Sequence, residues 1–155
     1  MDSLGALLAY GVAIPLLGFT AGLEDWGWKG WGICGAMALA CGLRLSRDNA
    51  ETPDYPRYQG LPPAAAALFL GGGLAQGIAP QSMAILFGLA IVLMLSPLRY
   101  PRLSLPLPMV APLGLLYAAA AFGWQPAWII LAALGLAYAL AGWALGLPAT
   151  TELKA

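Results

Sequence analysis

The chain passes from apolar to polar in the stretch Cys41-Gly42-Leu43-Arg44-Leu45-Ser46-Arg47-Asp48-Asn49, which closes a long hydrophobic run. Arg44 and Arg47 are three residues apart, so on a helix they share one face. Two guanidinium groups on one face can bind the oxygens of a phosphate in a fork. They can equally be membrane anchors whose stems run along apolar surface. The sequence therefore offers Arg44 and Arg47 as candidate lipid- or phosphate-binding residues and leaves the anchoring interpretation open.

The composition around this stretch is that of a membrane protein. Of 155 residues, 61% are hydrophobic and only 9% are charged, whereas a soluble domain has roughly a quarter of its residues charged. The chain has no His, so catalysis by His and metal binding by His are excluded within it. Seven scattered Lys and Arg residues make no basic field, so we expect no nucleic-acid partner.

Six apolar runs are separated by turns or polar loops, and we expect each run to be a transmembrane helix. The runs are residues 4–23, 28–45, 62–78, 82–95, 105–122 and 127–147. About 20 apolar residues are enough to cross a hydrocarbon core ~30 Å thick. The prediction is an all-α, polytopic membrane protein with about six spans, forming a single domain over residues 1–155. The loop 46–60 is too charged to lie within the membrane.

Proline and glycine predict irregular places within these runs. Pro15 should kink the first helix, because a proline inside a helix removes a hydrogen bond. Three prolines crowd the start of the fifth run and should make it irregular or kinked: Pro106, Pro108 and Pro112. The Gly71-Gly72-Gly73 run in the third helix allows a bend or a close backbone contact.

The distribution of charge predicts the orientation. Positive residues gather on one side, in loops that hold Arg44, Arg47, Arg57, Arg99 and Arg102 and in the tail with Lys154, whereas the opposite turns hold only Lys29. Five of the six tryptophans gather on the other side: Trp26, Trp28, Trp31, Trp124 and Trp128. Positive loops are typically cytoplasmic, and tryptophans mark a membrane interface. We therefore expect a multi-pass protein of the cell membrane with both termini in the cytoplasm.

Several short segments resemble the CDP-alcohol phosphatidyltransferase family, in particular its phosphatidylserine synthase branch. That branch carries an L-R-L-x-R-x-N segment, here residues 43–49, and a G-L-P-x-x-A-A segment that opens the next helix, here starting at Gly60. It also shows a Ser-x-x-Arg-Tyr stretch, here residues 96–100, and its D-S-L-x-D-x4-G-V-A-P segment is similar to the opening of this chain. The resemblance covers about the first two thirds of the chain and implies a helical membrane fold.

The family signature, D-G-x2-A-R-x8-G-x3-D-x3-D, holds a divalent metal over the diphosphate of a CDP-linked lipid. The resemblance aligns Asp2 with the third aspartate and Ala6 with the fourth. The first two aspartates would lie before Met1. Asp2 is then a vestigial metal ligand, since one carboxylate of four cannot hold the metal on which phosphoryl transfer depends. No catalytic residue is expected, and Mg²⁺ or Mn²⁺ is expected only if the chain is an enzyme.

Three functions remain open from the sequence. The first is a catalytically inactive relative of the transferases that serves as an accessory or structural subunit of a larger membrane complex, with membrane lipids and other membrane proteins as partners. The second is a transferase of the phosphatidylserine synthase type whose N-terminal catalytic part is missing from this chain. The third is a small transporter subunit, although the spans hold almost none of the ionisable residues that transport paths use.

Overall fold

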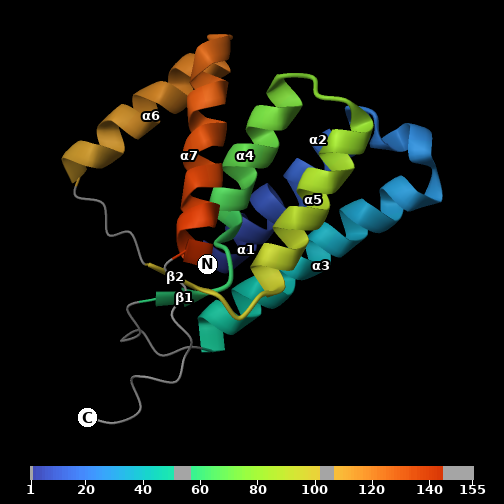
Figure 1. Ribbon diagram of the computed structural model, residues 1–155, viewed down its shortest axis with the longest axis horizontal. Helices are drawn as coiled ribbons and strands as arrows, with labels where there is room; N and C mark the ends of the chain where they lie inside the picture. Colours follow the sequence, from blue (N-terminus) through green and yellow to red (C-terminus); the bar gives the residue numbers. More distant parts are fainter. Residues whose placement is uncertain (1, 51–56, 102–106, 145–155) are drawn as a thin grey trace.

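The molecule is mostly helical, and the turns and loops that join its helices lie at two ends of the helical bundle (Figure 1). The computed structural model describes residues 2–50, 57–101 and 107–144. Its helices are α1 (Asp2–Ala6), η1 (Leu7–Ala13), α2 (Ile14–Thr20), η2 (Leu23–Trp26), α3 (Trp28–Ala50), α4 (Pro63–Ala75), α5 (Pro80–Leu95), α6 (Leu107–Ala121) and α7 (Gln125–Ala144). The predominance of helix in the structure confirms the predicted all-α class.

The predicted helical ranges agree with the structure to within a few residues, with one clear exception. The loop predicted from residue 46 begins later, because α3 continues to Ala50. The extension is stabilised by an ion pair between Arg44 and Asp48, which lie four apart on the helix. The prediction that residues 46–50 are loop is therefore wrong.

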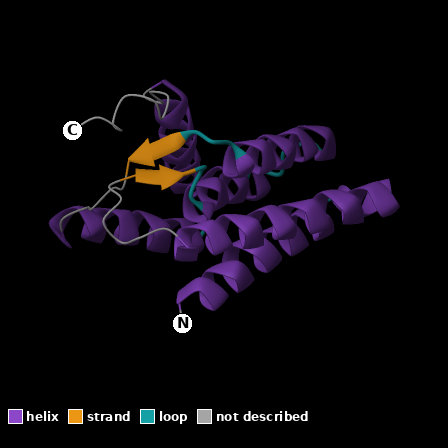
Figure 2. Ribbon diagram, turned by 90° about the horizontal axis from the view of Figure 1, so that it is seen from below, coloured by secondary structure: helices purple, strands orange, loops and turns teal. Residues whose placement is uncertain are grey.

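Two short strands also interrupt the helical pattern. β1 (Arg57–Gln59) and β2 (Arg99–Pro101) form an antiparallel ribbon in which Tyr58 lies opposite Tyr100. Figure 2 shows the two strands side by side, above the long helices in that view. Extended structure fits the residue before a proline, and Tyr100 precedes Pro101.

The first helix changes its hydrogen-bond pattern before Pro15, where the sequence predicted a kink. The structure places a π-helix, η1, directly before α2, which carries Pro15 near its start. Proline lacks the N–H that would bond back to the preceding turn, and η1 occupies the residues just before it. Pro112 lies inside α6 without ending it.

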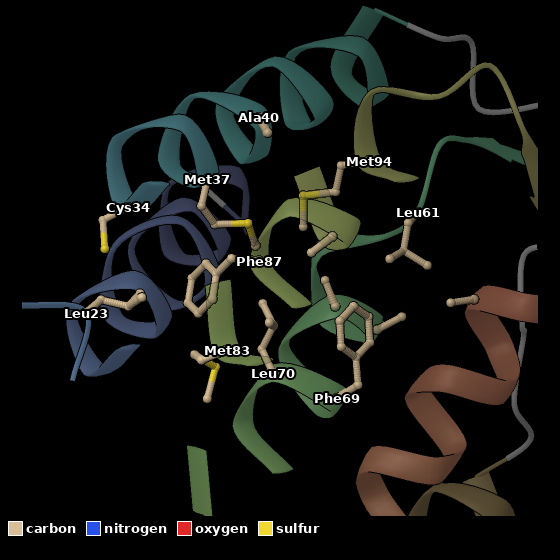
Figure 3. Close-up of a cluster of buried hydrophobic side chains, with 14 of the residues drawn as sticks. Leu23, Cys34, Met37, Ala40, Leu61, Phe69, Leu70, Met83, Phe87 and Met94 are labelled. Atoms are coloured by element: carbon tan, nitrogen blue, oxygen red, sulfur yellow. The ribbon is translucent and has the colours of Figure 1, made fainter. Parts of the chain in front are cut away.

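The core lies between α2, α3, α4 and α5 (Figure 3). Its largest members include Met37, Leu70, Phe87 and Met94, and small residues fill the space between them. A second, smaller cluster joins α6 and α7 through Ala120, Ala127 and Leu131. Small side chains bring helix backbones close together, so much of the core is made of helix-to-helix contact.

Large apolar side chains also point outward, on the first helix and on α3, α5, α6 and α7. The exposed aliphatic residues include Leu8, Val12, Leu16, Leu17, Leu39, Leu43, Ile85, Leu89, Val92, Leu115, Ile129, Ile130, Leu134, Leu136 and Leu140. The helices α4, α5, α6 and α7 contain no charged residue. Within the described ranges, however, no helix is at once long enough and apolar enough to cross a membrane. The six spans thus correspond to helices, and their crossing of a bilayer stays a prediction.

The two ends of the molecule differ in their residues. At one end lie the last turns of α3 with Arg44 and Arg47, together with the β1–β2 ribbon (Figure 1). We call this the ribbon end. At the other end lie the turns after α2, α4 and α6, with Trp26 in η2 and Trp124 just before α7. The arginines within the described ranges therefore gather at one end, as the sequence predicts.

Candidate functional site

The ribbon end contains a fully buried charge. Arg44 is 0% exposed. Its Nη1 donates to the carboxylate of Asp48, and its Nε donates to the carbonyl oxygen of Gly60 at 3.3 Å. Burying a guanidinium group is costly unless its charge and its hydrogen-bond donors are matched. Asp48 provides the opposite charge and Gly60 provides a backbone acceptor, so Arg44 ties the end of α3 to the segment that leads into α4.

Gly60 fits this position because of its missing side chain. Its φ angle is +83°, and a Cβ atom there would overlap the carbonyl oxygen of Met94 at the end of α5. Its N–H donates to the Leu98 carbonyl at 2.6 Å, and the Leu61 N–H donates to the Leu93 carbonyl at 3.0 Å. A residue with a side chain is disfavoured at positive φ and would also collide here. The segment 60–61 is therefore held between α3 and the chain that leaves α5.

Tyr100 joins the ribbon to α7. Its side chain is fully buried, and its hydroxyl donates to the Ala139 carbonyl at 3.3 Å. Its ring stacks on that of Tyr138, with the ring centroids 5.6 Å apart. Burial raises the pKa of the Tyr100 hydroxyl above its ordinary value, because the phenolate would lose its hydration. The hydroxyl therefore stays protonated and remains a donor at neutral pH.

Arg47 differs sharply from Arg44, although the two share one helix. Arg47 is exposed, and its Nη1 donates to the Leu95 carbonyl at 3.4 Å, a long hydrogen bond. The predicted two-arginine phosphate site would need both guanidinium groups to face the same ligand. The structure turns Arg44 into the protein and leaves Arg47 at the surface, so an anion at this end would meet Arg47 first.

The remaining candidate residues are only partly placed. The backbone of Asp2 begins α1, and its side chain lies outside what the structure describes, as does Arg102. Arg57 and Arg99 are the end residues of the ribbon and face Pro101 and Gln59 across it. Within residues 2–50, 57–101 and 107–144 there is no group of three or more His, Cys, Asp or Glu residues that could hold a metal ion.

Sequence reasoning gave no role to Gly60 or Tyr100 beyond their place in a motif. Weak signals for both were available. Gly60 comes two residues before Pro62, and glycine and proline are the residues that most strongly mark turns and loops. Tyr100 lies between Pro97 and Pro101, which favours extended structure. Neither signal reveals which helix the segment will contact, because that depends on the tertiary fold.

A second feature of the molecule is an open cleft of about 870 Å³ between the first helix and α4, with Tyr117 and Trp128 at its side. One wall is formed by η1 and α2, and the other by α4. No pattern in the sequence predicted it.

Neither models of known protein families nor curated proteins match this chain. The segments that resemble the transferases, residues 43–49, 60–65 and 96–100, do meet at the ribbon end through the Arg44–Gly60 and Gly60–Leu98 hydrogen bonds. Their bonds there are to backbone carbonyls and one carboxylate. This is the pattern of a structural clamp, and we use the name ribbon clamp for Arg44, Asp48, Gly60 and Tyr100.

Proposed function

We propose that this protein is a catalytically inactive helical membrane protein that serves as an accessory subunit of a larger membrane complex and associates with phospholipid. The observation that carries the proposal is the outward-facing apolar surface on uncharged helices. Ile85 in α5 is 71% exposed and Leu115 in α6 is 72% exposed. Helices that are apolar all round belong in lipid or inside a larger protein. Contiguous exposed apolar surface of this kind marks a membrane or protein contact.

The lengths of the helices set a condition on this proposal. The 16 residues of α5 rise about 24 Å and the 20 residues of α7 rise about 30 Å, against a hydrocarbon core of ~30 Å. A bilayer thins around a short apolar segment at a cost of fractions of a kcal/mol per Å. The protein would therefore sit in a locally thinned bilayer, or short helices such as α5 would be covered by a partner.

The absence of catalysis is supported by one residue and one contact. Ala6 stands where the resemblance places the fourth aspartate, and an alanine neither binds a metal nor accepts a proton. Arg44, the best candidate for a phosphate ligand, is instead committed to Asp48 and Gly60. Both features fit a protein that keeps the helical fold of the transferases and does not catalyse phosphatidyl transfer.

Phospholipid association is supported at the surface of the ribbon end. Arg47 is exposed there, and the backbone of Arg57 and Arg99 lies in the adjacent ribbon. Basic residues next to a membrane attract anionic head groups, at about 1 kcal/mol each. We therefore assign head-group contact to Arg47, and a structural role to Arg44.

The exposed aromatic residues at the opposite end support contact with lipid or with other subunits. Trp28 is 80% exposed, and Trp31 and Trp124 are also exposed. Tryptophan is enriched both at membrane interfaces and in the centres of protein interfaces. A subunit that meets both lipid and protein would use such residues at that end.

The proposal is tested on the full chain expressed in a bacterial membrane. After washing with alkaline carbonate, the protein should remain in the membrane pellet. After mild detergent extraction, it should migrate in a complex well above its own 16.0 kDa. Incubation with CDP-diacylglycerol, serine and Mg²⁺ or Mn²⁺ should give no product, while an active phosphatidyltransferase assayed in parallel does.

Two results would overturn the proposal. Release of the protein by carbonate would remove the membrane assignment. Metal-dependent turnover of the CDP-lipid by this chain would remove the inactive assignment and would favour the transferase instead.

A further inference from the structure

The cleft between the first helix and α4 has the dimensions of a ligand site. Its volume of about 870 Å³ lies within the range of ~300–1,000 Å³ that is usual for such sites. It follows α4 from Ala64 to Ala75, and on the other wall it extends from Ala9 in η1 to Ala21, just after α2. Eleven residue steps along α4 correspond to about 16 Å. That length is close to half of a ~30 Å hydrocarbon core, which is the depth of one leaflet.

The lining of the cleft is almost entirely apolar. None of its residues carries a charge, and its side-chain hydroxyl groups come from Tyr10, Thr20 and Tyr117. The Thr20 hydroxyl already donates to the Leu17 carbonyl at 3.1 Å. A charged ligand would lose its hydration here without gaining a partner. The lining therefore complements an uncharged hydrocarbon.

The cleft is long, open and lined without charge. An extended hydrocarbon chain suits such a groove, because it has no polar group that would need a partner there.

The π-helix contributes to this wall. Ala9, Tyr10 and Ala13 line the cleft, and all three belong to η1. π-helical turns are rare and are frequently found at functional sites. The π-helical segment before Pro15 therefore forms part of the wall that faces α4.

We propose that this cleft holds the hydrocarbon part of one bilayer phospholipid, lying along α4. The inference rests on the proposed membrane location and extends it by naming the ligand class and the residues that contact it. The hydrocarbon chain of the lipid lies between the small residues of α4, notably Ala67 and Gly71, and those of η1, notably Ala13. Tyr117 and Trp128, whose rings meet edge to face at 6.0 Å, flank it.

The test uses the purified full chain in vesicles of phosphatidylcholine and phosphatidylglycerol that contain a phospholipid with a photoactivatable acyl chain. After illumination, mass spectrometry locates the labelled peptides. We expect labels to concentrate on residues 9–21 and 64–75. The variant Ala67→Leu with Gly71→Leu fills the cleft and should reduce that labelling about tenfold, the equivalent of about 1.4 kcal/mol.

The chain offers a matched control. Gly88 on α5 is exposed, with no atom within 4 Å of an added Cβ, and lies outside the cleft. Gly88→Leu adds the same side chain and should leave the labelling of the cleft unchanged. A Cβ at Gly71 would lie 3.6 Å from Trp128 Cζ3, an ordinary contact, so the filling variant is expected to fold. Should it not, Ala13→Leu fills the cleft from the opposite wall and must give the same reduction.

Uniform labelling of all helices, or unchanged labelling in the filled variants, would overturn the inference. If the chain is embedded in the vesicles but shows no selective label, this inference fails and the proposed membrane location stands. If the chain does not stay with the vesicles at all, the proposed location fails and the lipid site fails with it.

Discussion

The helix α4 meets its neighbours in two opposite ways. Toward α7 it is closed: a Cβ atom at Gly72 would overlap Ala132 Cβ and lie 3.0 Å from the Trp128 carbonyl oxygen. Toward η1 and α2 it is open, and Gly71, the next residue, lines the cleft. Both faces are rich in small residues. Small residues on α4 therefore permit close contact with a neighbouring helix, and the side chains of that neighbour decide whether the contact is made.

The closed side is fixed at the ribbon end by hydrogen bonds. Arg44 holds Gly60, three residues before α4 begins, and Tyr100 holds Ala139 in α7. The start of α4 and the later part of α7 are thus positioned by the ribbon clamp. On the open side the facing residues include Ala9 and Ala13, whose side chains are too short to fill the space.

The largest expected effect is at Arg44. Replacing it in Arg44→Met keeps the length of the side chain and removes its charge. Asp48 then loses its partner and the Gly60 carbonyl loses a donor, so we expect the free energy of unfolding to fall by roughly 3 kcal/mol. Denaturant titration in detergent, followed by circular dichroism, measures the change.

The control for this prediction is three residues away. Arg47 is exposed and makes one long hydrogen bond, so Arg47→Met should change the free energy of unfolding by less than about 0.5 kcal/mol. If the two variants were equally stable, the clamp would not be what positions α4 against α7.

A smaller loss of stability is expected at Gly72, where α4 packs against α7. Gly72→Ala adds one methyl group where α4 touches α7, and Ala132 with the Trp128 backbone leaves no room for it. Overpacking of this kind costs about 1–3 kcal/mol. The melting temperature of the purified variant should fall, and an unchanged melting temperature would show that the two helices can move apart freely.

The sequence predicted the helices well and the contacts between them poorly. Apolar runs bounded by Gly, Pro and charged residues placed each helix within a few residues, because those signals are local. The inward turn of Arg44 was not predictable, since its partner Gly60 lies 16 residues away in a segment with no helical period. Helical spacing put Arg44 and Arg47 on one face, but three residues also turn a helix by about 300°, enough for one side chain to be buried and the other exposed.

The cleft was also beyond the reach of sequence reasoning. The Gly71-Gly72-Gly73 run predicted a bend or a close contact, and Gly72 makes that contact within a continuous helix. Nothing in the run distinguishes Gly72, which is covered by α7, from Gly71, which lines the cleft. That distinction depends on how far η1 lies from α4, which is a property of the assembled helices.

The hydroxyl of Tyr100 should contribute about 1 kcal/mol. Tyr100→Phe removes its hydrogen bond to Ala139 and leaves that carbonyl without this donor. The pKa of Tyr100 is raised by burial, so the folded state keeps the proton that the unfolded state releases near pH 10. This contribution to stability is present below about pH 10 and is lost as the pH rises further.

The pH dependence separates this role from simple packing. Between about pH 9 and 11 the parent protein should lose stability more steeply than Tyr100→Phe, because the variant has no group to ionise at this site. Thermal unfolding at several pH values measures both slopes. Equal slopes would mean that Tyr100 ionises as freely in the folded protein as in the unfolded chain.

The smallest expected effect is a slight stabilisation by Gly71→Ala, opposite in sign to the destabilisation by Gly72→Ala. It tests the comparison between the two faces of α4 most directly. Gly71→Ala adds the same methyl group as Gly72→Ala, one residue earlier in α4, but its Cβ meets only Trp128 Cζ3 at 3.6 Å. Alanine is the better helix former by about 0.5–1 kcal/mol, so the melting temperature should stay level or rise slightly. A fall as large as that of Gly72→Ala would mean that the cleft closes in solution and that both faces of α4 are packed. A rise in one variant beside a fall in its neighbour would show that one helix keeps a filled face and an open one, because intrinsic helix propensity acts in the same direction at both positions.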